Sequence, residues 1–271
     1  ARWIDPSAMV SHGRAPLISP GAAVLQAERA SPGFTVSRLF APDADNATWL
    51  AEMRGDGGRA RYASIDPAGG RLLRAGTVWD FPIEAALQIH YRLMAGKPGM
   101  MIILLNALAL LTMAATGLAY WWPKRGPITK HLSIRWSMAF RLVLRQAHRT
   151  LGVVMALLLA FMAVTGSLLI VPDLIEPSAP IVHRTPTDAA PIDPRLALGQ
   201  SAFPQRALPR FRVSTDRLTV NFHAPERNPR AVHRAIVTLS APHIISATRA
   251  ENNRALWTTI LPLHTGNSFG A

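Results

Sequence analysis

The sequence predicts a membrane protein in which two antiparallel transmembrane helices are flanked by two small α+β domains. Three features predict this fold class. Two long segments contain no charged residue, a short basic segment separates them, and each flank shows the pattern of one helix followed by several short strands. The chain has 271 residues, 49% of them hydrophobic. It is therefore long enough for two modest domains as well as the membrane helices.

The first flank, residues 1–97, is expected to form one extracytoplasmic α+β domain. Ser19 and Pro20 mark a helix start, because serine can cap the first N–H groups and proline suits the first helical position. The helix is expected to end near Ala30, before a Ser-Pro-Gly sequence. Four strands follow at residues 34–40, 48–54, 61–66 and 71–76, separated by turn sequences such as DPAGG.

The first transmembrane helix is expected at residues 98–123. No residue between Lys97 and Lys124 is charged, and about 20 apolar residues are enough to cross a hydrocarbon core of about 30 Å. Tyr120, Trp121 and Trp122 stand just before the basic residues, as in the aromatic belt at a membrane surface. This end of the helix is therefore placed at the cytoplasmic face.

A basic cytoplasmic loop is expected at residues 124–149. It holds seven Lys or Arg and no acid, and so supplies seven of the thirteen net positive charges. Short basic loops beside apolar segments stay in the cytoplasm, whereas flanks of this length cross regardless of charge. Because the charge is concentrated here, the net charge gives no support to nucleic-acid binding. Apolar residues alternate with arginines over residues 135–145, which is typical of a helix on an anionic membrane surface.

The second transmembrane helix is expected at residues 150–172, which again lack charge. It returns the chain to the extracytoplasmic side. Two core helices of a soluble protein are the alternative, but such helices seldom extend this far without a charge. The two segments share a pattern at an offset of 49, in which Thr116 and Gly117 match Thr165 and Gly166. Close packing of helices explains such small residues; a glycine facing a flat cofactor is the sharper alternative.

The second flank, residues 173–260, repeats the order of the first. Asp193 and Pro194 open a helix that is expected to reach about Ala202. Strands are expected at residues 211–214, 217–223, 231–239 and 243–249. The turn before the last strand is less certain, because SAPHI stands where the first flank has DPAGG. Residues 261–271 are expected to begin a further helix that is cut short, so the chain is interpreted as a fragment.

These motifs, in this order, resemble the PepSY-associated transmembrane family. His148, Arg149 and Gly152 resemble its HRxxG helix start, and TGSLLIVP and TGLAYWWPKR resemble its helix ends. RYASIDPAGGRLL resembles a PepSY hairpin. The segment from Trp257 through His264 to Gly270 resembles the start of a further helix, as does the segment from His90 to Gly99. The resemblance covers nearly the whole chain, and it implies that both flanking domains are PepSY-like.

The resemblance also implies haem b, with two haems in the full-length protein, and electron transfer through a bacterial inner membrane. Similar proteins include reductases linked to ferric siderophore uptake, so the implied activity is a membrane oxidoreductase reaction. It implies a cytoplasmic or membrane-bound electron donor, a ferric siderophore or similar acceptor, and periplasmic soluble domains. A bis-histidine haem needs two neutral imidazoles. The residues to which the resemblance assigns this role are the metal ligands His90, His148 and His264, with Arg92 and Arg149 beside the propionates.

Two other functions remain open at this point. PepSY domains resemble propeptide-type inhibitors, so the chain can be a membrane-anchored module that binds or inhibits an extracytoplasmic peptidase. It can also be a transport or assembly subunit without a redox centre. The sequence contains no cysteine and no visible P-loop or dinucleotide motif. His131 is expected to face lipid, and surface positions are expected for His12, His183, His223, His233 and His243; a metal held by His223 and His233 would lack a third ligand.

Overall fold

The structure is a computed structural model that describes residues 17–42, 47–123, 126–175, 192–204, 206–208, 210–214, 216–226, 231–253 and 255–266. The chain divides into two compact units. The first comprises residues 1–90, 177–262 and 268–271, and the second comprises residues 91–176 and 263–267. His12 and His183 lie outside the described residues.

The first unit contains the helix and strand order that the sequence predicts, in both flanks. In the first flank the elements are α1 (Pro20–Ala30), β1 (Phe34–Phe40), β2 (Trp49–Gly55), β3 (Ala60–Ile65) and β4 (Leu72–Gly76). In the second flank they are α6 (Ile192–Ser201), β5 (Arg210–Val213), β6 (Arg217–His223), β7 (Val232–Thr238) and β8 (Ile244–Thr248). The predicted elements are therefore confirmed, with ends that differ by a few residues.

The strands of the two flanks form one antiparallel sheet. Its order is β4-β3-β2-β1-β5-β6-β7-β8, so each flank contributes a four-stranded meander and the two meanders meet at β1 and β5. In that pairing Leu39 lies opposite Phe211 and Arg38 lies opposite Arg212. The pairing removes one exposed edge from each meander, and exposed edges are prone to aggregation. The sequence predicts two modules, and their union into one sheet is new in the structure.

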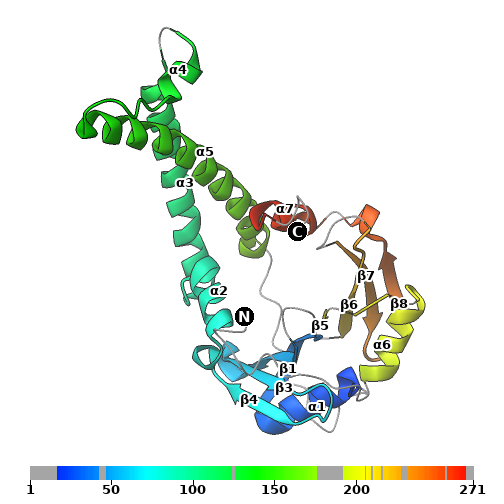
Figure 1. Cartoon of the computed structure of the whole chain (residues 1–271). Coiled ribbons are helices and arrows are strands. Elements are labelled where there is room, and N and C mark those ends of the chain that lie inside the picture. Colours follow the sequence, from blue (N-terminus) through cyan, green and yellow to red (C-terminus); the bar gives the residue numbers. More distant parts are fainter. Residues whose placement is uncertain are drawn as a thin grey trace. The chain divides into compact units, whose positions relative to one another are not determined.

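One face of the sheet carries the hydrophobic core. Alternate side chains of the central strands point to this face, where Leu39, Met53, Phe211 and Phe222 are almost fully buried. Helices α1 and α6 cover the same face (Figure 1), and both contribute residues to a single buried cluster. The two flanks therefore share one core.

Helix α1 is capped from both flanks. Ser19 is its N-cap residue, and the Ser19 hydroxyl accepts a hydrogen bond from Ala22 N. The carboxylate of Asp193, at the start of α6, accepts hydrogen bonds from Gly21 N at 2.7 Å and from Ser19 Oγ at 2.6 Å. A carboxylate at a helix N-terminus is favourable, because the N–H groups there have no partner within the helix.

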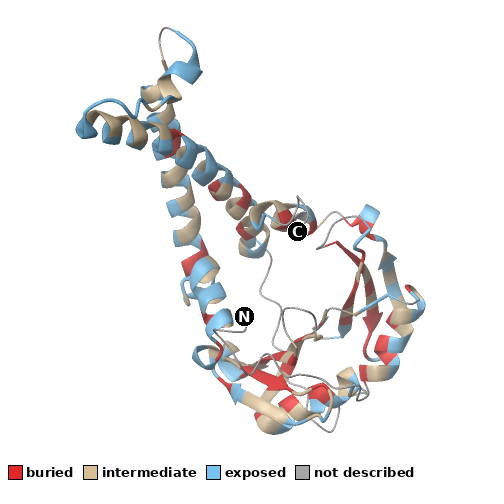
Figure 2. Cartoon of the chain, viewed as in Figure 1, coloured by how far each residue is buried: buried red, intermediate tan, exposed pale blue. Residues whose placement is uncertain are grey.

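The second unit holds the two long helices. They are α3 (Gly96–Trp121) and α5 (Phe140–Ile175), connected through the short helix α4 (Ile128–Leu132). Both are long and apolar enough to span a membrane, and only 6% of the most apolar 18-residue stretch of α3 and 22% of that of α5 are buried within the described chain. Figure 2 shows both helices mostly exposed. Because core helices of a soluble protein are mostly covered by protein, the exposed apolar surfaces of these two helices favour the membrane interpretation.

The second helix begins earlier than the expected membrane segment. α5 starts at Phe140, ten residues before the predicted start at Thr150, and is continuous through Pro172 to Ile175. The basic segment of residues 140–149 is thus the first part of α5. At the other end of the helix pair, Lys97 Nζ donates a hydrogen bond to Leu174 O at 3.2 Å, and Arg92 forms an ion pair with Asp173 at 3.7 Å.

Candidate functional site: a histidine fixed against the second membrane helix

His264 is the predicted ligand for which the structure provides a defined partner. It is the last residue of α7 (Leu256–His264), and its side chain is half-buried. The Nδ1 atom of His264 lies 2.9 Å from the hydroxyl oxygen of Thr165 on α5. Both residues belong to the second unit. The second membrane helix therefore orients this imidazole.

The Thr165 hydroxyl lies within hydrogen-bond distance of His264 Nδ1 and of two backbone carbonyls, Phe161 O at 2.8 Å and Met162 O at 3.2 Å. A hydroxyl has a single proton to donate. When this proton is donated to Phe161 O, the hydroxyl accepts a hydrogen bond from Nδ1–H of His264. In the neutral imidazole the lone pair is then on Nε2, a nitrogen that can ligate a metal.

Gly166 allows the ring to approach α5 closely. An added Cβ at this position would lie 3.3 Å from Cε1 of His264, which is tighter than ordinary contact. The small residue at this point of the repeat therefore makes room for the imidazole. The contact with His264 is a case of close packing, and a glycine that faces a flat cofactor stays a prediction.

The corresponding position of the first membrane helix has the same local geometry without a histidine. Thr116 on α3 donates to Thr112 O at 2.8 Å and lies 3.1 Å from Met113 O, as Thr165 does one repeat later. An added Cβ at Gly117 would meet nothing within 4 Å among the described residues. The back-bonded threonine alone is thus a feature of both helices, whereas the contact with His264 belongs to Thr165.

His148 and Arg149 lie toward the other end of α5. Both side chains are exposed. His148 precedes Thr165 by seventeen residues, which at 1.5 Å per residue is about 25 Å along the helix. Within the predicted membrane segment of residues 150–172, His148 lies just before the start, whereas Thr165 and its neighbour His264 lie about 10 Å before the other end. They do not share one site.

His90 and Arg92 occupy the end of helix α2 (Pro82–Arg92). His90 is exposed and belongs to the first unit, whereas Arg92 belongs to the second. The guanidinium of Arg92 lies 4.7 Å from the Tyr91 ring and is paired with Asp173. Its Nε is buried and has no hydrogen-bond acceptor among the described residues. The pairing of His90 with His264 stays a prediction.

His233 is a correction to the sequence analysis, which placed it at the surface. It is only 7% exposed. Its ring stacks on Phe203 at 4.8 Å, Nδ1 accepts from Ala250 N at 3.0 Å, and Nε2 lies 3.3 Å from Glu226. His233 is therefore a structural core residue. The signal was its position between Val232 and Ala235 on an alternating strand. His243 is exposed, as expected.

No group of three or more His, Asp or Glu side chains that could hold a metal ion occurs among the described residues. His223 is on the strand face opposite to that of His233, because Phe222 lies directly across from His233 in the β6–β7 pairing. The two histidines cannot bind one ion. Sequence reasoning could not separate them, since it lacks the register.

A buried charge cluster occupies the other face of the sheet. Glu52 on β2 is 6% exposed and lies 2.5 Å from Arg54 and 3.6 Å from Arg38. Burial raises the pKa of Glu52, but the charges of Arg38 and Arg54, the hydrogen bond from Arg54 and the charge of Arg212 outweigh it, and the pKa is lowered. Burial, with the charges of Glu52 and Glu84, raises the pKa of Tyr62 to about 12.

The fold and site together define a class: a membrane protein with two apolar spans, a second unit of helices and an antiparallel sheet, and a histidine that contacts the second span. The chain belongs to the family described as PepSY-associated TM region, whose model matches residues 1–271. Comparison with curated proteins found no match.

Proposed function

We propose that this protein carries b-type haem and transfers electrons across a bacterial inner membrane to a ferric siderophore or a similar acceptor. The observation that supports the proposal most is the hydrogen bond from His264 to Thr165. It holds Nδ1, so Nε2 is the ring nitrogen that is available to a metal. Histidines that ligate metals usually have the other nitrogen held by such a partner, which also fixes the orientation of the ring.

The residues of this chain fit a haem group in two respects. His264 has its Nδ1 held by Thr165, and Arg92 has a buried Nε without an acceptor among the described residues, where a propionate oxygen can accept. Asp173 is the competitor for Arg92, at 3.7 Å. Bound haem would supply one-electron chemistry, by cycling between ferric and ferrous iron. The protein's own contribution is to orient ligands, to neutralise propionates and to keep water away.

Placement along α5 supports transfer across the membrane. His148 and His264 are separated by about 25 Å along α5, which is far enough apart for each to serve a separate haem. Arg149 follows His148 directly and is assigned to the propionates of the inner group. Under this proposal His90 completes the outer site. The electron donor is a cytoplasmic or membrane-bound protein, and the sheet unit faces the periplasm.

The test is the visible spectrum of the purified full-length protein, oxidised and then reduced, after expression with haem supplied. Low-spin haem bands are expected. His264→Ala and His148→Ala should each lower the haem content per protein by about half, because each removes a ligand of a different group. His223→Ala is the matched control, because it also removes an imidazole, on β6, and should leave the spectrum unchanged.

A colourless protein would overturn the proposal. The alternative function, a membrane-anchored PepSY module that binds an extracytoplasmic peptidase, would then be favoured, since it uses none of these histidines.

A further inference from the structure

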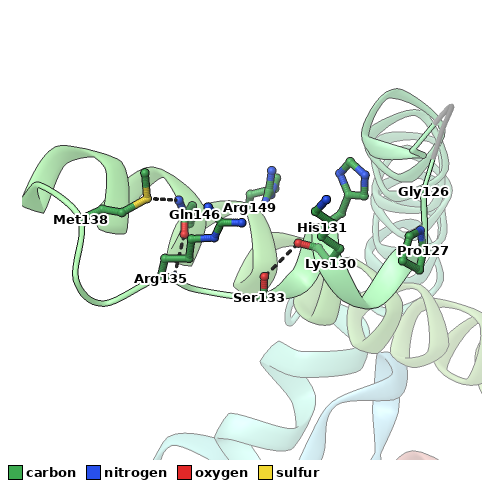
Figure 3. Close-up of a pocket in the computed structure, with 9 residues that line it drawn as sticks. All are labelled: Gly126, Pro127, Lys130, His131, Ser133, Arg135, Met138, Gln146 and Arg149. Carbon is green, nitrogen blue, oxygen red and sulfur yellow. Dashed lines mark hydrogen bonds between the residues drawn. The ribbon is translucent and has the colours of Figure 1, made fainter.

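The segment that connects the two membrane helices forms a hollow lined by cationic side chains. Its volume is 480 Å³, whereas one water in the liquid occupies about 30 Å³, so it has room for a polar headgroup. The cations Lys130, Arg135 and Arg149 line it together with His131 and other residues, and none of the lining residues is acidic. Figure 3 shows the Arg149 and His131 side chains projecting from the same side of the ribbon.

Like charges gathered in this way repel one another unless an anion lies among them. The segment from residue 124 to residue 149 offers no internal carboxylate, because it holds seven Lys or Arg and no Asp or Glu. A carboxylate partner for the cations that line the hollow can therefore come only from outside the segment. An oxyanion is suited to this, since arginine and lysine both donate hydrogen bonds to phosphate oxygens.

The hollow is held in shape by hydrogen bonds to side chains of α5. Gln146 on α5 accepts a hydrogen bond from Arg135 N at 2.8 Å and donates one to Met138 Sδ at 3.2 Å (Figure 3). Thr150 donates to Leu132 O at 3.0 Å. These contacts fix the segment against α5 while using only the backbone of Arg135. Its guanidinium is not needed for them.

The surroundings of the hollow are those of a membrane surface. Trp136 and Phe140 are 76% and 78% exposed, and both lie in the stretch between the hollow-lining Arg135 and Gln146. Large aromatic side chains next to lysines and arginines are typical of the boundary between headgroups and acyl chains. A ligand with a phosphate head and an apolar tail would use both features.

We propose that this hollow binds the phosphate group of an anionic ligand, supplied by the headgroup of an acidic phospholipid. The inference does not depend on haem. A free phosphate ion has the same chemistry and is the other source to be distinguished. The headgroup is favoured by the exposed aromatic residues, which free phosphate would leave unused.

The experiment titrates the full-length protein in detergent with phosphatidylglycerol and with phosphatidylcholine of the same acyl chains, and counts bound lipids by native mass spectrometry. One phosphatidylglycerol should bind in preference to phosphatidylcholine. The double variant Lys130→Gln/Arg135→Gln should weaken phosphatidylglycerol binding about 25-fold, because each cation removed from beside a phosphate is expected to weaken binding about fivefold. Arg141→Gln/Arg145→Gln is the matched control: it removes the same charge from residues of the same segment that do not line the hollow, and should weaken binding by about threefold or less.

A second arm adds inorganic phosphate and measures the protection of residues 126–138 from hydrogen exchange. Protection by phosphate that is lost in the Lys130→Gln/Arg135→Gln variant, without any lipid preference, would support the phosphate site and assign it to the free ion. Equal weakening in both double variants would overturn the proposal, because the effect would then be diffuse surface charge. Failure of both lipid and phosphate to bind would overturn it as well. Circular dichroism checks that the variants keep their helices.

Discussion

Replacing Gly21 with alanine is expected to destabilise helix α1 when residue 193 is aspartate and to stabilise it when residue 193 is alanine. Gly21 lies in the first turn of α1, and an added Cβ would come within 2.6 Å of the Asp193 carboxylate. That carboxylate belongs to the second flank and holds both Gly21 N and Ser19 Oγ. The Gly21→Ala variant must therefore push the carboxylate away and lose at least one of these hydrogen bonds.

The magnitude follows from two opposing contributions. A hydrogen bond to a charged group contributes about 1.5–3 kcal/mol, which we reduce to about 1.5–2 kcal/mol because Asp193 is partly exposed. Replacing glycine by alanine within a helix stabilises it by about 0.5–1 kcal/mol. The Gly21→Ala change should therefore destabilise α1 by about 1 kcal/mol in the natural protein. In the Asp193→Ala background, where no carboxylate is present, it should stabilise α1 by about 0.5–1 kcal/mol.

The assay is hydrogen exchange of the α1 amides, measured by mass spectrometry on the full chain in detergent. It gives the local free energy of opening for the natural protein, for each single variant (Gly21→Ala and Asp193→Ala) and for the double variant. Asp80→Ala is the control, because Asp80 accepts from the N–H and hydroxyl of Thr77 within its own flank and should leave α1 unchanged. If Gly21→Ala has the same effect in both backgrounds, Asp193 does not cap α1, and the proposed link between the flanks through their helices is wrong.

Three further outcomes are expected. Glu52→Gln should lower the free energy of unfolding by about 2–3 kcal/mol in a denaturant titration at pH 7, because it leaves partly exposed arginines without their buried partner. The pKa of Glu52 is lowered in the folded protein. The difference in stability between the two proteins should therefore disappear as the pH falls below about 4. Tyrosinate absorbance should show that one of the three tyrosines ionises near pH 12, and this step should be absent in the Tyr62→Phe variant. Because the pKa of Tyr62 is raised in the folded protein, the stability that Tyr62 contributes is retained below about pH 10 and falls as the pH rises toward 12. Gly99→Ala should abolish folded protein on size-exclusion chromatography, since its Cβ would lie 1.7 Å from Arg92 O. Gly117→Ala should be tolerated, because its Cβ would meet nothing within 4 Å in the described part of the chain; equal yields of the two variants would contradict this.

Local structure was predictable from the sequence because local signals encode it. The Ser19-Pro20 start of α1 and the DPAGG turn worked as expected: Gly70 N donates to Asp66 O at 2.9 Å, and Ala68 N donates to the Asp66 carboxylate at 3.1 Å. In the second flank the uncertain turn is closed by a different residue. Thr238 accepts from His243 N through its hydroxyl at 3.1 Å, which takes the place of the aspartate.

Contacts between distant segments could not be predicted. Each meander satisfies its own alternation, so nothing in the residues of β1 or β5 indicates that these two edges pair. The start of α5 was placed too late, because the charged residues before Thr150 were used to mark the boundary of the segment. The helix itself begins among those charged residues, at Phe140. For the candidate site, the repeated Thr-Gly pattern at Thr165 was noticed, but its partner His264 follows 99 residues later and only the fold brings the two together.

The most direct test of the haem proposal compares Thr165→Val with Thr116→Val. Both variants remove a back-bonded hydroxyl from a membrane helix at the same point of the repeat, but only Thr165 also holds a histidine. The measurement is the haem dissociation constant of the purified full-length protein, obtained by spectral titration. The account predicts that Thr165→Val weakens one haem about 10–100-fold, the usual effect of losing the partner of a ligating histidine, while Thr116→Val binds as the natural protein does. Equal affinities for the two variants would contradict it.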